Sequence, residues 1–227
     1  MDEARLTLPE QILLLALTDR DGSLLDETRF EVALGGALLA ELLFDEFAEF
    51  DSGSGGFLVS PVRRKRTGDP ALDQALVELH TAPRRASPRR WIERFAENRE
   101  LHLEVARQLC RKGALDEHQG RVRLVFRRTV YVDVDPDARE RLLGRIRGAV
   151  LDRAPGDLRT AVLAALAGAG VLLEAVLGED EMNGHGEGLI ALVEEAEVDD
   201  TRRGLRDRLL AVVRATHETM GDPAAAA

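Results

Sequence analysis

The sequence predicts a mainly α-helical, compact protein with one or two small β-hairpins. Of the 227 residues, 44% are hydrophobic but only 4% are aromatic, so the core must consist largely of leucine, valine and alanine. Leucine and alanine have the highest helix propensities. Apolar residues also recur at helical spacing over most of the chain, whereas only two short regions have the character of strands.

The first two predicted elements are helices. Thr7 and Glu10 have the spacing of a capping box, and the run that follows is apolar on all sides, which is typical of a buried helix. A second helix is predicted over residues 27–44. Gly35 and Gly36 lie in its middle, although each costs roughly 1 kcal/mol of helix stability relative to alanine. Close approach of another helix is the simplest reason for this pair, and a ligand approaching the backbone is the alternative.

Two hairpins interrupt the helices. The first pairs residues 48–51 with 57–59 across a glycine-rich turn. The second lies within residues 114–134, where 116–120 is expected to be a turn and 121–126 alternates arginine with apolar residues. Helices are predicted over residues 70–80, 88–96, 97–111, 136–151, 158–177, 188–198 and 202–219. Since no linker divides the chain, we expect one domain over residues 1–227, ordered from about 6 to 219, with a flexible tail at 220–227.

Charge is divided along the chain. Residues 1–60 carry a net charge of −10, residues 61–150 of +8 and residues 151–227 of −8. A basic segment in an acidic protein indicates a confined site for an anionic partner. The alternative is a solvated face that pairs with acidic residues of the same protein. Nucleic acid is disfavoured because no aromatic stacking motif accompanies the arginines, whereas an anionic lipid surface requires only one basic face.

The sequence contains no pattern that supports catalysis. The five histidines lack the spacing of zinc ligands, and neither a nucleophile elbow nor a dinucleotide-binding glycine motif occurs. We therefore predict no catalytic residue, no metal ligand and no cofactor. The single cysteine, Cys110, cannot form an intramolecular disulfide, and the longest apolar stretch, residues 160–173, is too short to span a membrane. Without a signal-peptide pattern, we expect a cytoplasmic protein, peripheral on the inner face of the cell membrane. Its scarcity of lysine is typical of a GC-rich, bacterial genome.

Seven short segments together resemble the Golgi phosphoprotein 3 family. They are residues 6–17, 19–22, 36–42, 67–73, 91–93, 112–115 and 157–160, and their order and spacing span nearly the whole chain. The resemblance implies a compact fold with a central helical bundle and a protruding hairpin. It also implies a peripheral adaptor, which in eukaryotic members binds phosphatidylinositol 4-phosphate and retains glycosyltransferases. An anionic membrane lipid and a protein cargo are the partners that it implies.

The family's headgroup pocket is only partly retained at the matching positions. The resemblance implies a pocket built from a tryptophan and three basic residues. The tryptophan position falls at about Asp26 and the first basic position at Gly35, so neither is kept. The other two basic positions fall at Arg99 and His102, whose i, i+3 spacing puts them on one face of a helix.

The predicted membrane hairpin matches the family better. We expect its apolar side chains to insert and its arginines to lie at headgroup depth. The residues concerned are Arg121, Val122, Arg123, Leu124, Phe126, Arg127 and Arg128. The resulting hypothesis is a non-enzymatic protein that binds anionic lipid through a basic face and a hairpin. The alternative is a soluble protein-interaction adaptor whose basic face docks an acidic partner.

Overall fold

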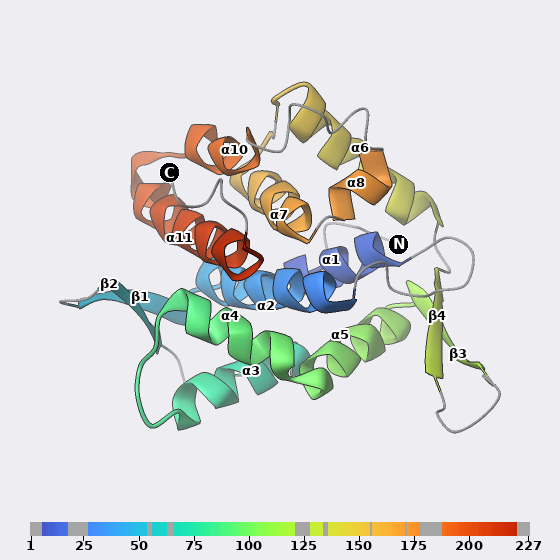
Figure 1. Ribbon diagram of the computed structural model, residues 1–227, viewed down its shortest axis with the longest axis horizontal. Coiled ribbons are helices and arrows are strands. Elements are labelled where there is room, and N and C mark those ends of the chain that lie inside the picture. The colour runs from blue at the N-terminus through green and yellow to red at the C-terminus, as the bar shows by residue number, and fades with distance from the viewer. Residues whose placement is uncertain are drawn as a thin grey trace.

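The computed structural model describes residues 6–17, 27–53, 56–62, 66–120, 128–133, 136–154, 156–170, 172–177 and 188–221. Figure 1 shows its elements, which in chain order are α1 (Leu8–Ala16), α2 (Glu27–Phe44), β1 (Ala48–Gly53), β2 (Gly56–Pro61), α3 (Pro70–Thr81), α4 (Pro88–Glu97), α5 (Arg99–Arg111), β3 (Leu115–Gly120), β4 (Arg128–Asp133), α6 (Pro136–Leu151), α7 (Leu158–Ala169), α8 (Leu172–Leu177), α10 (Leu189–Glu195), η3 (Asp200–Arg202) and α11 (Arg203–Thr219). The predicted mainly helical fold with small hairpins is confirmed.

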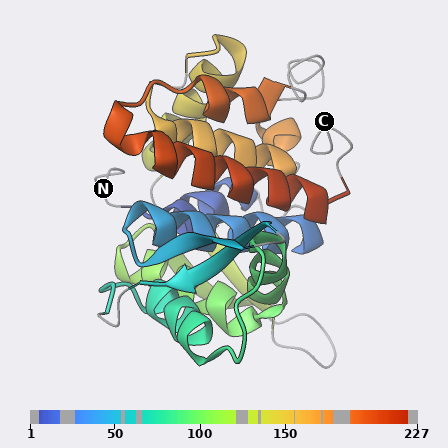
Figure 2. The ribbon, with the colours of Figure 1, turned by 90° about the vertical axis from the view of Figure 1, so that its left-hand side faces the viewer.

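Helix α2 lies at the centre of the molecule. It packs against α1, α4, α7 and α11, and every residue from 32 to 43 is buried. In Figure 2, α7 and α11 lie on one side of α2, and α3, α4 and α5 lie on the other. A helix that has neighbours on both sides needs apolar residues all round. Residues 32–43 are apolar or glycine except for Glu41.

The glycine pair in α2 permits this close packing. A Cβ on Gly35 would lie 2.7 Å from the backbone oxygen of Ile92 in α4, and a Cβ on Gly36 would lie 2.5 Å from Oγ1 of Thr216 in α11. Neither distance is compatible with a real side chain. Close helix approach, the simplest reason for the pair, is therefore confirmed, and α4 occupies the side of Gly35 where a ligand would have to lie.

Side-chain caps set the beginnings of three helices. Asp69 accepts hydrogen bonds from the first amides of α3, Asn98 accepts one from Glu100 N at 3.0 Å, and Asp157 accepts one from Thr160 N at 2.8 Å. Such caps satisfy amides that have no partner inside the helix. Because Asn98 both ends α4 and begins α5, the second of these helices starts at Arg99, two residues later than predicted.

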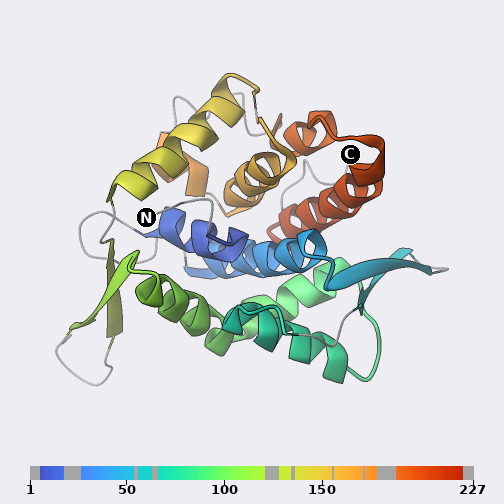
Figure 3. The same ribbon diagram turned by 180° about the vertical axis from the view of Figure 1, so that it is seen from behind.

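Each hairpin is a two-stranded antiparallel sheet. Strand β1 pairs with β2 from Ala48↔Pro61 to Gly53↔Gly56, and β3 pairs with β4 from Leu115↔Asp133 to Gly120↔Arg128. The two hairpins project from opposite ends of the molecule (Figures 1 and 3). A hairpin lies in each of the two predicted regions, but the turn predicted at 116–120 was wrong, because those residues form β3. The strand expected at 121–126 lies outside the described residues. Backbone pairing with β4 holds this polar segment extended without an apolar face.

Two predicted helix bounds also need correction. The helix expected over 158–177 is divided into α7 and α8, because the chain turns at Gly170, across which the apolar pattern continues unbroken. The last helix begins at Arg203, after the short turn η3 that Asp199 caps through a bond from Arg202 N at 3.0 Å. At Gly170 the local backbone geometry overrides a continuous helical pattern, whereas the start of the last helix differs from its predicted position by one residue.

Two buried carboxylates connect the layers. Glu41 in α2 accepts hydrogen bonds from Leu8 N at 2.7 Å and from the Arg159 guanidinium at 2.6 Å, which joins α1, α2 and α7. Glu10 in α1 lies 2.6 Å from Nζ of Lys112, just beyond the end of α5. Since a buried carboxylate needs partners, these contacts restrict how the helices can be arranged.

Candidate functional site

Exposed arginines gather on the layer formed by α3, α4 and α5. Residues 66–112, called the basic layer below, contain ten lysines and arginines and seven acidic residues. Nine arginines in it are exposed: Arg66, Arg84, Arg85, Arg89, Arg90, Arg94, Arg99, Arg107 and Arg111. The layer lies on one side of α2, with a hairpin near each end (Figure 1). This is the part of the molecule that the charge pattern of the sequence indicates.

Many of these arginines form ion pairs within the layer. Arg89 and Arg90 contact Glu93 at 3.1 and 3.0 Å, and Arg94 reaches Glu78 of α3 at 2.9 Å. Exposed pairs of this kind contribute only about 0–1 kcal/mol each to stability, but they orient the guanidinium groups. The layer therefore compensates part of its own charge, as the alternative interpretation of the sequence expects.

The same pairs alter the acidity of two glutamates. The hydrogen bonds from Arg90 and Arg89 hold the pKa of Glu93 below its ordinary value. For Glu104, desolvation is the largest single influence and would raise the pKa, but the bonds from Arg111 and Arg107 together lower it. Both carboxylates therefore act as acceptors that hold the guanidinium groups in place.

The two predicted headgroup residues lie in different surroundings. Arg99 is exposed at the start of α5 and has no ion pair within the described part of the chain. The His102 side chain is only 12% exposed. Its Nε2 lies 3.1 Å from the Phe95 oxygen, its Nδ1 lies 3.7 Å from the Glu31 carboxylate, and its ring packs edge-on against Phe30. The predicted shared face therefore presents Arg99 to solvent, while His102 serves the contact between α2, α4 and α5.

The two positions that depart from the family pocket are only partly visible. Asp26 lies outside the described residues. Gly35 faces the backbone of α4, where a side chain would meet the Ile92 oxygen. A cation at position 35 is therefore sterically excluded with the helices in this arrangement.

The predicted membrane hairpin is β3–β4. Arg128 is the first residue of β4 and pairs with Gly120. The other predicted insertion and headgroup residues, Arg121, Val122, Arg123, Leu124, Phe126 and Arg127, lie outside the described residues. The hairpin stem projects from the end of the basic layer, next to the C-terminal end of α5 (Figures 1 and 3).

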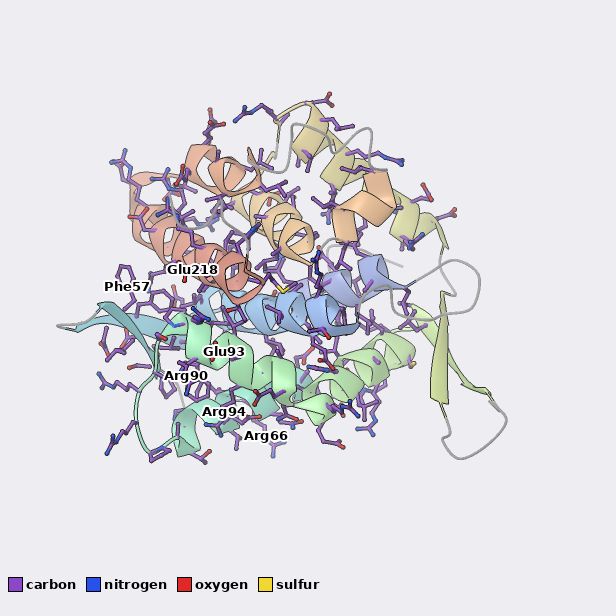
Figure 4. The ribbon with its side chains drawn as sticks, in the orientation of Figure 1. Phe57, Arg66, Arg90, Glu93, Arg94 and Glu218 are labelled. Atoms are coloured by element: carbon purple, nitrogen blue, oxygen red, sulfur yellow. The ribbon has the colours of Figure 1, made fainter. Side chains whose placement is uncertain are left out.

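A hollow beside α4 was not predicted from the sequence. Its volume is about 350 Å³, and it lies between the α3–α4 connection and the face of α4 that carries Arg90, Glu93 and Arg94 (Figure 4). Trp91 also lines it. The i, i+4 spacing of Arg90 and Arg94 around the chain's single tryptophan is the signal that could have indicated it.

Two classes of site have no support in the described residues. No three histidine, cysteine, aspartate or glutamate side chains within them are grouped so that they could hold a metal ion. None of the helices that they form is both long enough and apolar enough to cross a membrane.

Comparison with known proteins identifies the family. The family model described as Golgi phosphoprotein 3 (GPP34) matches residues 8–227. None of the curated proteins matches the chain. The family match covers nearly the whole sequence, including the central helix, the basic layer and both hairpins. The chain therefore belongs to the Golgi phosphoprotein 3 family.

Proposed function

We propose that this protein is a non-enzymatic adaptor that binds anionic membrane surfaces as a peripheral protein. Membership of the Golgi phosphoprotein 3 family is consistent with an adaptor role in general. The observation that carries the membrane proposal is the position of the β3–β4 hairpin. It projects from the end of the basic layer, next to the C-terminal end of α5. Helix α5 carries the exposed arginines Arg107 and Arg111.

The sequence between the two strands suits a membrane interface. It alternates arginine with apolar residues from Arg121 to Phe126 and is followed by Arg127 and Arg128. In such a segment, apolar side chains enter the boundary between headgroups and acyl chains while guanidinium groups stay among the phosphates. Each arginine near an anionic surface contributes about 1 kcal/mol, so several together support reversible, salt-sensitive binding.

Binding is proposed to depend on surface charge rather than on recognition of phosphatidylinositol 4-phosphate. Gly35 has no room for a cation, and the His102 ring is engaged by Glu31 and Phe95. Of the three matching pocket positions that the structure describes, only Arg99 is exposed. Vesicles of equal surface charge, made with phosphatidylserine or with the phosphoinositide, should therefore bind the protein equally.

Co-sedimentation with vesicles tests the proposal. Phosphatidylcholine vesicles containing phosphatidylserine should retain the wild type at low salt, and pure phosphatidylcholine vesicles should not. Phe126→Asp and the double variant R121E/R123E should each abolish retention. The matched control is R202E/R203E, which makes the same change of charge at the exposed start of α11 and should bind normally.

Two results would decide against membrane binding. Equal recovery with neutral and anionic vesicles, unaffected by Phe126→Asp, would show that retention does not involve this surface. Capture of an acidic protein that R121E/R123E abolishes, without any lipid binding, would instead select the soluble adaptor.

A further inference from the structure

The hollow beside α4 combines a cluster of arginines with an unsatisfied hydrogen-bond donor. It lies between the segment that joins α3 to α4 and one face of α4, and three arginines line it: Arg84, Arg90 and Arg94. Glu93 and Glu97 line it as well, so its charged groups have a net charge of +1. We name this hollow the Trp91 hollow.

Trp91 carries the unsatisfied donor. Trp91 is 2% exposed, and its indole Nε1–H has no acceptor among the residues that the structure describes. The ring is held between neighbours, with the Phe95 ring 5.6 Å away and the Arg94 guanidinium 5.1 Å from its centre. Buried polar groups in folded proteins are nearly always hydrogen-bonded, so a donor without an acceptor requires an explanation. One explanation is that a ligand bound in the hollow supplies the acceptor.

The arginines of the hollow retain donors for a ligand. Arg90 uses one nitrogen on Glu93 and Arg94 uses one on Glu78, which orients both groups but leaves most of their N–H bonds available. Arg84 is exposed and has no ion pair within the described residues. Pre-oriented guanidinium groups are the preferred partners of phosphate oxygens.

We propose that the Trp91 hollow binds a phosphate group. Arg84 and Arg90 would contact its oxygens, and the indole N–H of Trp91 would donate to one of them. A dianionic phosphate group can accept hydrogen bonds from several donors at once, and its charge is opposite to the net +1 of the hollow. Inorganic phosphate and the headgroup of phosphatidic acid share this chemistry. The proposal stands apart from the β3–β4 hairpin and from lipid binding through it.

Trp91 is the only tryptophan in the chain, so its fluorescence reports directly on the hollow. One arm titrates the protein with inorganic phosphate against sodium chloride of equal ionic strength. The second arm uses phosphatidylcholine vesicles containing phosphatidic acid, against phosphatidylserine vesicles of equal surface charge. A saturable change with inorganic phosphate identifies a site open to soluble phosphate. A change with phosphatidic acid vesicles alone identifies a lipid headgroup site.

Variants separate specific binding from general charge. Arg84→Gln should weaken the phosphate response about tenfold or more, as expected for the loss of a hydrogen bond between charged groups. Arg85→Gln is the matched control, because its side chain pairs with Asp51 and does not line the hollow. Trp91→Phe, followed by calorimetry, should also lower the affinity for whichever phosphate source binds, while circular dichroism verifies that it folds.

Three results would overturn the proposal. They are the absence of a saturable response in both arms, an equal loss in Arg84→Gln and Arg85→Gln, and unchanged affinity in a folded Trp91→Phe protein. None of them depends on Phe126 or Arg121, so failure of this site and failure of the membrane hairpin can be distinguished.

Discussion

At residue scale, Gly35 shows how a single missing side chain sets a helix contact. Gly35→Ala would place a Cβ 2.7 Å from the Ile92 oxygen, a backbone atom that can move only with α4. Overpacking of this kind costs about 1–3 kcal/mol, which exceeds the gain of up to about 1 kcal/mol in helix propensity. Urea denaturation should therefore show a lower free energy of unfolding for Gly35→Ala.

Gly144 provides the control for this prediction. It lies in α6, where a Cβ would meet no atom within 4 Å. Gly144→Ala should therefore raise the free energy of unfolding, by up to about 1 kcal/mol. If both substitutions stabilised the protein, the close contact between α2 and α4 would not be the reason for glycine at position 35.

The headgroup pair illustrates what could be predicted at this scale. The i, i+3 spacing correctly places Arg99 and His102 on one helix, because helical periodicity is a local property. It could not indicate that Glu31 and Phe30, about seventy residues earlier in the chain, would engage the histidine ring. Partners that are distant in sequence depend on the packing of the whole bundle.

At element scale, Asn98 separates α4 from α5. Its side chain accepts the first amides of α5 at 3.0 and 3.4 Å and also donates to Glu78 of α3. Asn98→Ala removes the cap and should cost about 1 kcal/mol, or about 2–4 °C in the unfolding midpoint of a protein of this size. Thermal unfolding followed by circular dichroism measures this change.

Serine at the same position distinguishes the two functions of Asn98. Asn98→Ser keeps a capping oxygen but is too short to reach Glu78. It should therefore retain most of the stability that Asn98→Ala loses. A midpoint as low as that of Asn98→Ala would mean that the bond to Glu78, not the cap, holds this junction.

Most element types could be predicted, but several boundaries could not. Apolar periodicity predicts α4 and α5, whereas α2 is predicted from a long run that is apolar on nearly all sides. The polar composition of residues 116–120 predicts a turn, although pairing with β4 makes them a strand. The break between α7 and α8 was missed because apolar residues continue across Gly170. Strand pairing and turns depend on backbone partners that composition does not reveal.

At the scale of the whole molecule, the buried ion pair of Glu41 and Arg159 should make stability depend on pH. Burial raises the pKa of Glu41 above its ordinary value of 4.5, and Arg159 offsets this only in part. The folded state therefore keeps a proton that the unfolded state has already lost. The stability linked to this proton is complete below pH 4.5 and is lost as pH rises through the folded pKa. Glu41→Gln cannot ionise and should lack this loss.

Glu104 gives the opposite sign and so completes the test. The pKa of Glu104 is lowered in the folded state. The stability that this carboxylate contributes is therefore present above its ordinary pKa of 4.5, and it is lost as pH falls through the folded pKa. Urea unfolding on both sides of that pH compares Glu41→Gln and Glu104→Gln with the wild type. The free energy of unfolding of Glu41→Gln minus that of the wild type should increase with pH. The same difference for Glu104→Gln should decrease with pH. If the difference in free energy of unfolding between Glu41→Gln and the wild type stays constant with pH, the pKa of Glu41 is not raised. The Glu41–Arg159 contact between α1, α2 and α7 would then behave as an ordinary ion pair.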